Sequence, residues 1–244
     1  SKIVSKYVNN KNFPHILIEE YNYILKPRDE DGYRSHHLVY KYVNKGNPSY
    51  DGLRVEMQFR TKLQHIWATA VETVGVFLKQ SLKTRQGDEA WLNFFALVSS
   101  CFALQESTPP LQKFKHLDNE QTCARIWQQE KDLRIIAQLQ DFKYVVDSVG
   151  DAKGHSYHLI VNNNLEKTIS IESFDRKSQQ QALSEFNRRE QEANDNIDVT
   201  LVSAGRIETL RKAYPNLFLD LSEFIEHLKK IISIGEKVNG IGLG

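Results

Sequence analysis

Residues 53–60, with the sequence L-R-V-E-M-Q-F-R, alternate apolar and polar side chains without a break. Successive side chains of a β-strand point to opposite faces of the sheet, so this alternation is typical of a strand with one buried face. We expect four apolar side chains to face a core: Leu53, Val55, Met57 and Phe59. Four polar side chains would form a row on the opposite face: Arg54, Glu56, Gln58 and Arg60. Such a row is most often the solvated face of an antiparallel sheet, and the alternative is the floor of a binding site.

The composition limits the classes of protein to which this chain can belong. Its 244 residues suffice for one large domain or two modest ones, and 40% hydrophobic with 26% charged residues is an ordinary globular composition. The net charge of +1 gives no general attraction to nucleic acid, and Cys101 and Cys123 lack metal-ligand spacing. Two cysteines cannot form a disulfide framework, so we expect a reducing, cytoplasmic compartment. No apolar run reaches the roughly 18 residues that a membrane span needs, and no signal peptide opens the chain, so we expect no membrane partner. Because the chain begins at Ser1 in a polar segment and its single methionine is Met57, we also expect it to be a piece of a longer protein.

The neighbouring segments place this strand in a sheet beside a helix. Residues 14–25 suggest a short strand or an extended connection, and residues 33–43 suggest a strand. The turn-rich loop at 44–52 predicts that the strands on either side of it form an antiparallel pair, which would bring His37 and Lys41 near the polar row. Between residues 62 and 79 the apolar period changes from two to 3.6, which predicts a helix capped by Thr61.

The remainder of the chain predicts an α+β fold in two parts. Helices are expected at 89–106, 119–141, 177–193, from 206 onward and at 221–232. Short strands are expected at 144–147, 156–161, 167–173 and 197–203. We therefore predict a first domain at residues 1–118, a connecting helix at 119–141 and a small α+β domain at 142–244.

Basic, aromatic and imidazole side chains crowd the strand pair, with a single carboxylate among them. They are Tyr33, Arg34, His36, His37, Lys41, Arg54, Glu56, Gln58, Arg60 and His65. This composition suits a polyanion such as a nucleoside polyphosphate. Glu56 would serve as a magnesium ligand or as the base that accepts a hydroxyl proton, and Tyr33 would offer a flat face to a nucleobase. The alternative is a solvated sheet in which Tyr33 is an edge packing residue.

The residues G-Y-R-S-H-H at 32–37, then V-E-M-Q-F-R-T at 55–61 and Q-H at 64–65, closely resemble the synthetase domain of the RelA/SpoT alarmone enzymes. That family shows a G-Y-[RQ]-S-x-H turn, then an E-[IVM]-Q-[IFV]-R-T strand that runs into a helix carrying a histidine. The resemblance covers about residues 14–80. It implies a mixed, mainly antiparallel sheet of the nucleotidyltransferase-like synthetase type, packed with helices. It also implies transfer of the β,γ-diphosphate of ATP to the 3′-hydroxyl of GDP or GTP, with Mg²⁺ as cofactor.

The resemblance implies a role for each matching residue. Glu56 would act at the 3′-hydroxyl as base or metal ligand, and Tyr33 would stack on the acceptor base. The other contacts to the acceptor nucleotide would come from Arg28, Arg34, His37, Lys41 and Gln58. Supporting residues of the site would be Arg54, Arg60 and His65. Asn22 stands where the family usually has an aspartate.

Two family motifs are absent from these 244 residues, namely the Arg-x-Lys-x-x-Ser segment on the ATP side and the Asp-[IVL]-x-G-x-R strand with the magnesium aspartate. We therefore expect that this chain by itself does not bind ATP productively.

The part after about residue 119 resembles the C-terminal extensions of some single-synthetase proteins, including toxic forms fused to a self-inhibiting domain. This resemblance implies a first alternative, a toxin of the fused toxin–antitoxin, phage-defence type. It would pyrophosphorylate the 3′ CCA end of tRNA and would be regulated through its C-terminal domain by a protein regulator or a phage protein. A second alternative is a non-catalytic nucleotide-binding or interaction module. Assembly into a homo-oligomer stays open at this point.

Overall fold

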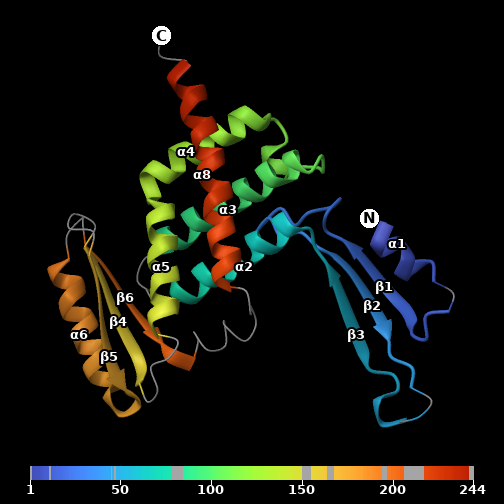
Figure 1. Ribbon diagram of the computed structural model, residues 1–244, viewed down its shortest axis with the longest axis horizontal. Coiled ribbons are helices and arrows are strands. Elements are labelled where there is room, and N and C mark those ends of the chain that lie inside the picture. The colour runs from blue at the N-terminus through green and yellow to red at the C-terminus, as the bar shows by residue number, and fades with distance from the viewer. Residues whose placement is uncertain are drawn as a thin grey trace. The chain divides into compact units, whose positions relative to one another are not determined.

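The structure is a computed structural model (Figure 1), which describes residues 2–10, 12–44, 46, 48–78, 85–149, 155–163, 168–193, 197–205 and 217–241. The chain divides into two compact units: residues 1–65 with 93–122, and residues 66–92 with 123–244. The expected domains at 1–118 and 142–244 follow chain order, whereas these contacts group residues 66–92 with the C-terminal part. Among the described helices, none has the length and apolar character needed to cross a bilayer.

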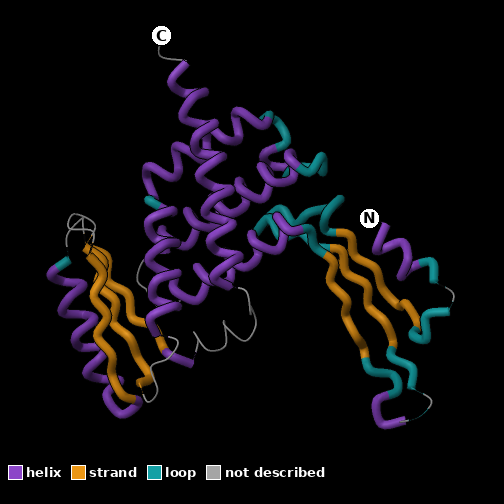
Figure 2. Tube along the Cα trace, viewed as in Figure 1, coloured by secondary structure: helices purple, strands orange, loops and turns teal. Residues whose placement is uncertain are grey.

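The first unit contains a three-stranded antiparallel sheet in the order β1-β2-β3 (Figures 1 and 2). Its strands are β1 (Ile16–Asn22), β2 (His36–Lys41) and β3 (Arg54–Phe59). The expected pairing of the last two strands is confirmed, and the segment at 14–25 forms a strand rather than an extended connection. The α+β class is also confirmed, and the sheets of the described residues contain antiparallel pairs throughout.

Helix α1 (Lys2–Val8) packs on one face of this sheet. Its Val4 is buried together with Leu38 and Tyr40 of β2. The partly buried side chains around them are Tyr7, Val8, Phe13, Leu17, Met57 and Phe59. The apolar face of the sheet is therefore a small core of its own, and the polar side chains of β3 lie on the other face.

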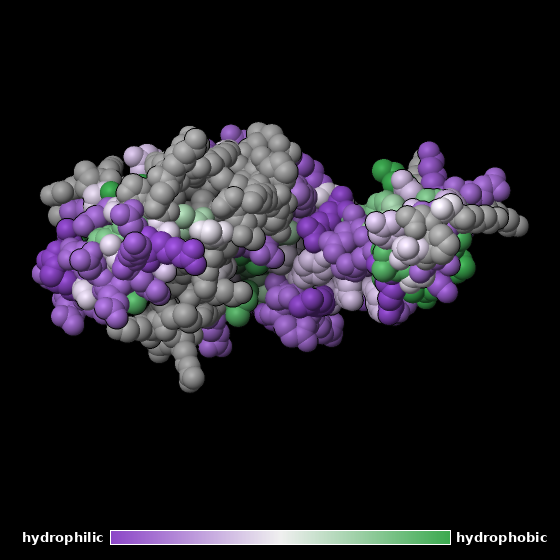
Figure 3. Space-filling model, turned by 90° about the horizontal axis from the view of Figure 1, so that it is seen from below, coloured by the Kyte–Doolittle hydropathy of each residue, from purple (hydrophilic) through white to green (hydrophobic). Residues whose placement is uncertain are grey.

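The expectation that all four apolar residues of this strand segment face the core is half wrong. Met57 and Phe59 do pack against the core cluster. Leu53 and Val55 are 53% and 43% exposed, because the cluster under α1 does not extend as far as the start of β3. Seen from below, apolar residues lie at the surface in this part of the first unit (Figure 3). The alternation predicts the face of the sheet to which each side chain points, but it does not predict how much of that face other residues cover.

Helix α2 (Lys62–Leu78) begins directly after β3, at a capping box. The backbone N–H of Gln64 donates to Thr61 Oγ1 at 3.2 Å, and the backbone N–H of Thr61 donates to Gln64 Oε1 at 3.1 Å. The expected cap at Thr61 is confirmed. Helix α3 (Arg85–Gln105) begins four residues earlier than the expected start at 89. From residue 93 onward it belongs to the first unit.

The expected helix at 119–141 is two helices, α4 (Asn119–Leu133) and α5 (Ile135–Val149). Arg134 interrupts them in the left-handed region, at φ 51°. The Glu130 carboxylate accepts the backbone N–H of Ile136 at 3.1 Å and so caps α5 from the preceding helix. Burial raises the pKa of this carboxyl group. A cap supplied from the preceding helix does not match the usual sequence pattern, which explains why the break was missed.

The expected strand at 144–147 is wrong, because these residues belong to α5. Their aromatic and β-branched side chains favour a strand locally. The apolar stripe formed by Ile135, Leu139 and Phe142 is buried at helical spacing, and packing of that stripe overrides the local preference.

The second unit combines helices with a second antiparallel sheet, in the order β5-β4-β6 (Figure 1). Its strands are β4 (His155–Asn163), β5 (Thr168–Asp175) and β6 (Ile197–Ser203). Helix α6 (Gln179–Glu192) contacts this sheet and contributes the buried residues Ala182 and Phe186. The last helix, α8 (Leu217–Ile241), starts before and ends after the expected range of 221–232, and it packs against α5. The helix expected from residue 206 lies outside the described residues.

Candidate active site

The polar face of the first sheet is built by the register of its strands. His37 of β2 pairs with Gln58 of β3, and the next position on the same face pairs Val39 with Glu56. Side chains two residues apart on one strand share a face, so His37, Glu56 and Gln58 project to the same side. This arrangement confirms the expected proximity of His37 to the polar row.

Tyr33 reaches this face from the turn that precedes β2. Its hydroxyl lies 2.9 Å from Nε2 of His37 and accepts a hydrogen bond from Nη2 of Arg60 at 2.8 Å. The same guanidinium nitrogen donates to Oε1 of Gln58 at 2.9 Å. The Tyr33 hydroxyl therefore ties together residues that lie far apart in the sequence, from the turn, from β2 and from the segment that follows β3.

Glu56 is held on its two oxygens by different neighbours. Oε1 lies 2.6 Å from Nδ1 of His37, and Oε2 accepts a hydrogen bond from Nε2 of Gln58 at 3.0 Å. The hydrogen bond from Gln58, with the hydrogen bond from His37 and the positive charge of Arg60, lowers the pKa of this carboxyl group below its ordinary value. Glu56 is therefore ionised at neutral pH. Its side chain is 43% exposed, and contact with water also favours the ionised form.

The hydrogen-bond pattern fixes the orientation of the His37 ring, with Nδ1 toward Glu56 and Nε2 toward Tyr33. An ionised carboxylate only accepts, so Nδ1 of His37 carries the proton that lies against Glu56. In the neutral imidazole, Nε2 then accepts the hydroxyl proton of Tyr33, whose oxygen accepts from Arg60. The result is a continuous chain of polarised bonds from Arg60 through Tyr33 and His37 to Glu56.

Two guanidinium groups lie over the ring of Tyr33. The Cζ atom of Arg60 is 5.2 Å from the ring centroid, and the Cζ atom of Arg28 is 5.6 Å from it. Arg28 is also paired with Asp31 at 2.5 Å. The aromatic face of Tyr33 is therefore bordered by positive charge, which is the setting that a nucleobase bearing phosphates requires.

Three of the residues expected at the site lie apart from this network, namely Arg34, Lys41 and Arg54. Arg54 is paired with Glu19 and is solvent-exposed. Lys41 is exposed and stands opposite Arg54 in the strand register. His65 lies in the first turn of α2 and is half-buried. Arg34 points into the interior, where Nε donates to Ser99 Oγ at 3.0 Å and Nη1 donates to the carbonyl oxygen of Ile24 at 3.2 Å.

The network around Tyr33 contains one carboxylate, that of Glu56, as a possible ligand for magnesium. The described residues contain no group of three or more histidine, cysteine, aspartate or glutamate side chains arranged to hold a metal ion. Mg²⁺ usually takes one or two protein carboxylates and completes its shell with water and substrate phosphates. Glu56, whose side chain is 43% exposed, fits that mode of binding as the single protein ligand.

Two further tyrosines extend the aromatic surface, and the sequence interpretation did not assign them to the site. Tyr23 lies edge-on to His37 and Tyr33, with centroids 5.2 and 6.0 Å away. Tyr21 stacks on Tyr23 at 5.9 Å with an interplanar angle of 7°. A cavity of about 470 Å³ beside them is lined by Glu20, Tyr21, Asn22, Tyr23, Leu25 and Lys26. Residues two apart in an extended chain point to the same side, so the spacing of the two tyrosines in the sequence could have indicated this shared aromatic surface.

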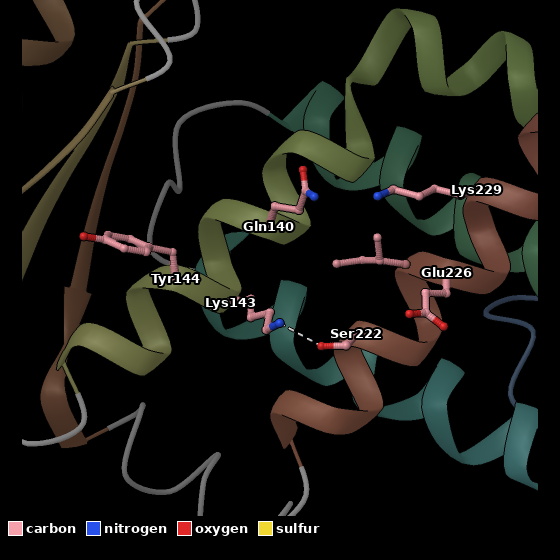
Figure 4. A pocket seen from close by; sticks show the side chains of 7 residues that line it. Gln140, Lys143, Tyr144, Ser222, Glu226 and Lys229 are labelled. Atoms are coloured by element: carbon pink, nitrogen blue, oxygen red, sulfur yellow. Dashed lines mark hydrogen bonds between the residues drawn. The ribbon is translucent and has the colours of Figure 1, made fainter.

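A second hollow lies in the second unit, between α5 and α8 (Figure 4). Its volume is about 440 Å³, and it is lined by Gln140, Lys143, Tyr144, Ser222, Ile225, Glu226 and Lys229. The ammonium group of Lys143 donates to Ser222 Oγ at 2.7 Å. With two lysines and one glutamate, the groove would present net positive charge to a ligand.

Comparisons with known proteins reach this chain only at the level of solved structures. No protein-family model and no curated protein matches it. It is similar to the small alarmone synthetase 1 from Bacillus subtilis bound to its product pppGpp, at 24% identity and a TM-score of 0.34. It is also similar to a GTP pyrophosphokinase family protein from Streptococcus pneumoniae, at 21% identity and a TM-score of 0.34. Each match covers 43% of this chain and 53% of the other, so the chain spans about half the length of the structures it matches.

Proposed function

We propose that the network around Tyr33 is the acceptor half of a diphosphate-transfer site, in which ATP gives its β,γ-diphosphate to the 3′-hydroxyl of GDP or GTP. The observation that carries this proposal is the chain of contacts Arg60–Tyr33–His37–Glu56. It places one ionised carboxylate, one aromatic face and several cationic groups around one point of an exposed sheet face. That combination matches the three parts of a guanine nucleotide acceptor, namely the base, the sugar hydroxyl and the phosphates.

Tyr33 is the platform for the acceptor base. Its hydroxyl is fixed by Arg60 and His37, so the ring loses little further freedom when a base stacks on it. Arg28 and Arg60 lie near enough to the ring to meet the phosphates of the stacked nucleotide. His37 has contacts at both ring nitrogens, so a bond from His37 to a phosphate requires Nε2 to carry a proton and to exchange the Tyr33 hydroxyl for that phosphate.

Glu56 acts on the 3′-hydroxyl. The oxygen of that hydroxyl forms a bond to the β-phosphorus of ATP and its proton passes to solvent. The bond between this phosphorus and the oxygen it shares with the α-phosphate breaks, which releases AMP. A carboxylate with a lowered pKa is a weak proton acceptor, so we favour Glu56 as the group that orients the hydroxyl through a hydrogen bond and as the protein ligand of magnesium. When bound there, magnesium would neutralise charge on the transferring diphosphate.

The more distant residues keep supporting roles in the proposal. Lys41 and Arg54 stand at the outer end of the polar face, where they would attract the phosphates of an incoming nucleotide. His65 and Gln58 would hold the surroundings of Glu56 and Arg60. The second unit, with its positively charged groove, would serve as the accessory or regulatory domain.

The test is incubation of the full-length protein with γ-labelled ATP and GDP, GTP or bulk tRNA, followed by separation of the labelled products. We expect label in a guanosine tetra- or pentaphosphate. Label in tRNA would identify the toxin-type activity, and no label in any acceptor would favour a non-catalytic binding module. The 244-residue chain alone, run in parallel, should transfer no label because it lacks the ATP-side motifs.

A further inference from the structure

The carbonyl that precedes Tyr33 is anchored to α3 rather than to the sheet. Oγ of Ser99 donates to the carbonyl oxygen of Gly32 at 2.6 Å, and that oxygen belongs to the peptide unit from which Tyr33 extends. Ser99 lies on α3, and it is separated from Gly32 by 67 residues in the sequence. A short hydrogen bond of this kind, between two uncharged groups, fixes the distance between this peptide group and α3.

Arg34 completes the anchor from the other side of Tyr33. Its Nε donates to the same Oγ of Ser99, so the serine hydroxyl bridges the residues on either side of Tyr33. Nη1 of Arg34 donates to the carbonyl oxygen of Ile24, which ties the segment that follows β1 to the same point. Arg34 is 3% exposed, and its burial lowers the pKa of the guanidinium to about 10.

The contacts of Arg34 and Ser99 lower the stability of the fold, which argues that they do more than fill space. Nη2 of Arg34 is buried and makes no hydrogen bond to the residues that the structure describes. A buried charged group with incomplete partners destabilises a fold relative to an apolar side chain of similar volume. The arrangement holds the two residues that flank Tyr33 in place, and the side chain of Tyr33 itself is half-buried.

The backbone of the turn at Gly32 lies close against α3. Gly32 has φ +78°, and a Cβ atom added to it would lie 3.0 Å from both Ala96 Cα and Ser99 Cβ. On its N-terminal side, the backbone N–H of Tyr33 donates to Oδ1 of Asp31 at 2.9 Å. The turn is therefore pressed against α3, and the peptide group between Gly32 and Tyr33 is bonded at both its carbonyl oxygen and its N–H.

We propose that Ser99, together with Arg34, is a positioning residue that sets the orientation of Tyr33 for stacking on the acceptor base. This inference rests on the proposed acceptor site and adds to it a control point on α3, outside the sheet and outside the motifs of the turn and β3. It also reassigns Arg34 from acceptor contact to support of the turn. Removal of the serine hydroxyl frees both the Gly32 carbonyl and Arg34 Nε, so the ring of Tyr33 should sample other orientations.

The test compares Ser99→Ala with Ser100→Ala. Ser100 is the next residue on the same helix, is also fully buried and also bonds a backbone group, because its Oγ accepts the N–H of Leu111 at 3.2 Å. Both variants lose one buried hydroxyl, and only Ser99 touches the turn of Tyr33. The near-isosteric Ser99→Cys, with its weak donor, serves as a second variant if Ser99→Ala fails to fold.

Two readouts separate positioning from stability. The first is the ring resonance of Tyr33 in the chain labelled with ring-¹³C tyrosine, identified by its disappearance in Tyr33→Phe. The second is the dissociation constant of GDP from calorimetry. Ser99→Ala should shift or broaden the Tyr33 resonance and weaken GDP binding by about ten-fold, whereas Ser100→Ala should leave the resonance in place and change binding by less than about two-fold.

An unchanged Tyr33 resonance in a folded Ser99 variant, or equal effects of the two serine variants, overturns the positioning role. The two proposals fail separately. If the unsubstituted chain does not bind GDP at all, the acceptor-site proposal is contradicted, and the Tyr33 resonance still decides whether Ser99 positions this side chain.

Discussion

Nδ1 of His37 lies 2.6 Å from Oε1 of Glu56, and the opposite nitrogen of the same ring lies 2.9 Å from the hydroxyl of Tyr33. The imidazole therefore connects the residue proposed to bind the acceptor base to the residue proposed to act on the acceptor hydroxyl. Stacking of a base on Tyr33 and orientation of the sugar by Glu56 would be coupled through one rigid side chain.

Glu56→Gln should abolish transfer while acceptor binding persists. The amide keeps the size of the side chain and loses the negative charge, so we expect the transfer rate of the full-length protein to fall by about 10²- to 10⁴-fold. GDP affinity and the thermal midpoint should stay close to those of the unsubstituted protein. Glu19→Gln is the matched control, because Glu19 stands in the same row of the sheet, opposite Val39, and pairs with Arg54. Retained turnover in Glu56→Gln would remove Glu56 from the reaction.

Gln58→Leu should raise the pKa of Glu56, because the hydrogen bond from Gln58 is the main cause of the lowered pKa. The sign follows from linkage: a carboxyl group with a lowered folded-state pKa stabilises the fold above its ordinary value and loses that contribution as the pH falls through the folded-state pKa. The contribution is small at this exposed site. The measurement is a carbon NMR titration of the Glu56 carboxyl group between pH 7 and pH 2. Gln121→Leu, which changes a surface glutamine bonded to Asp118, should leave the pKa of Glu56 in place. An unchanged midpoint in Gln58→Leu speaks against this hydrogen bond.

Gly32→Ala should destabilise the first unit by about 1–3 kcal/mol. The added methyl would meet Ala96 and Ser99 at 3.0 Å, in a backbone conformation that alanine rarely adopts. Gly75→Ala is the control, because Gly75 lies in α2 with nothing within 4 Å of the added carbon, and alanine there should stabilise the helix by up to about 1 kcal/mol. Denaturant unfolding measures both. Equal stability of the two variants would show that the turn is not pressed against α3.

Gly235→Ala should destabilise the second unit strongly. A Cβ atom on Gly235 of α8 would lie within 3 Å of the carbonyl group of Cys123 and of Trp127 Cβ on α4, so the two helices would have to separate. We expect a loss of about 2–4 kcal/mol, as for overpacking of a close helix contact. Gly240→Ala, in the same helix with nothing within 4 Å, should be neutral or slightly stabilising. A Gly235→Ala variant as stable as Gly240→Ala would contradict the close approach of α4 and α8.

The local features of the site could be read from the sequence because they follow strand periodicity and cap chemistry. Alternation placed Glu56 and Gln58 on one face, the turn-rich loop paired β2 with β3, and Thr61 marked the start of α2. The order of motifs around Tyr33 also singled out the residues that the fold brings together.

What the sequence did not reveal depends on contacts between distant segments. Arg34 looked like a phosphate ligand because it is an arginine beside Tyr33, but its side chain bonds to Ser99 of α3. Leu53 and Val55 were expected to be buried because alternation predicts the face to which a side chain points. It does not predict whether other residues cover that face, and both side chains are exposed. The break at Arg134 depends on a carboxylate of the preceding helix. Each of these outcomes is decided by tertiary packing, which no short window of sequence contains.

The most direct measurement of the central claim is calorimetric binding of GDP to the 244-residue chain and to its Tyr33→Ala and Tyr50→Ala variants. Tyr50 is a 55% exposed tyrosine in the loop between β2 and β3, so it controls for loss of an aromatic ring elsewhere in the same unit. Base–aromatic stacking is worth about 1–3 kcal/mol, so Tyr33→Ala should weaken GDP binding by roughly ten- to a hundred-fold while Tyr50→Ala binds like the unsubstituted chain. Equal GDP affinity in all three proteins, or no GDP binding by the unsubstituted chain, would contradict the assignment of this face as the acceptor site.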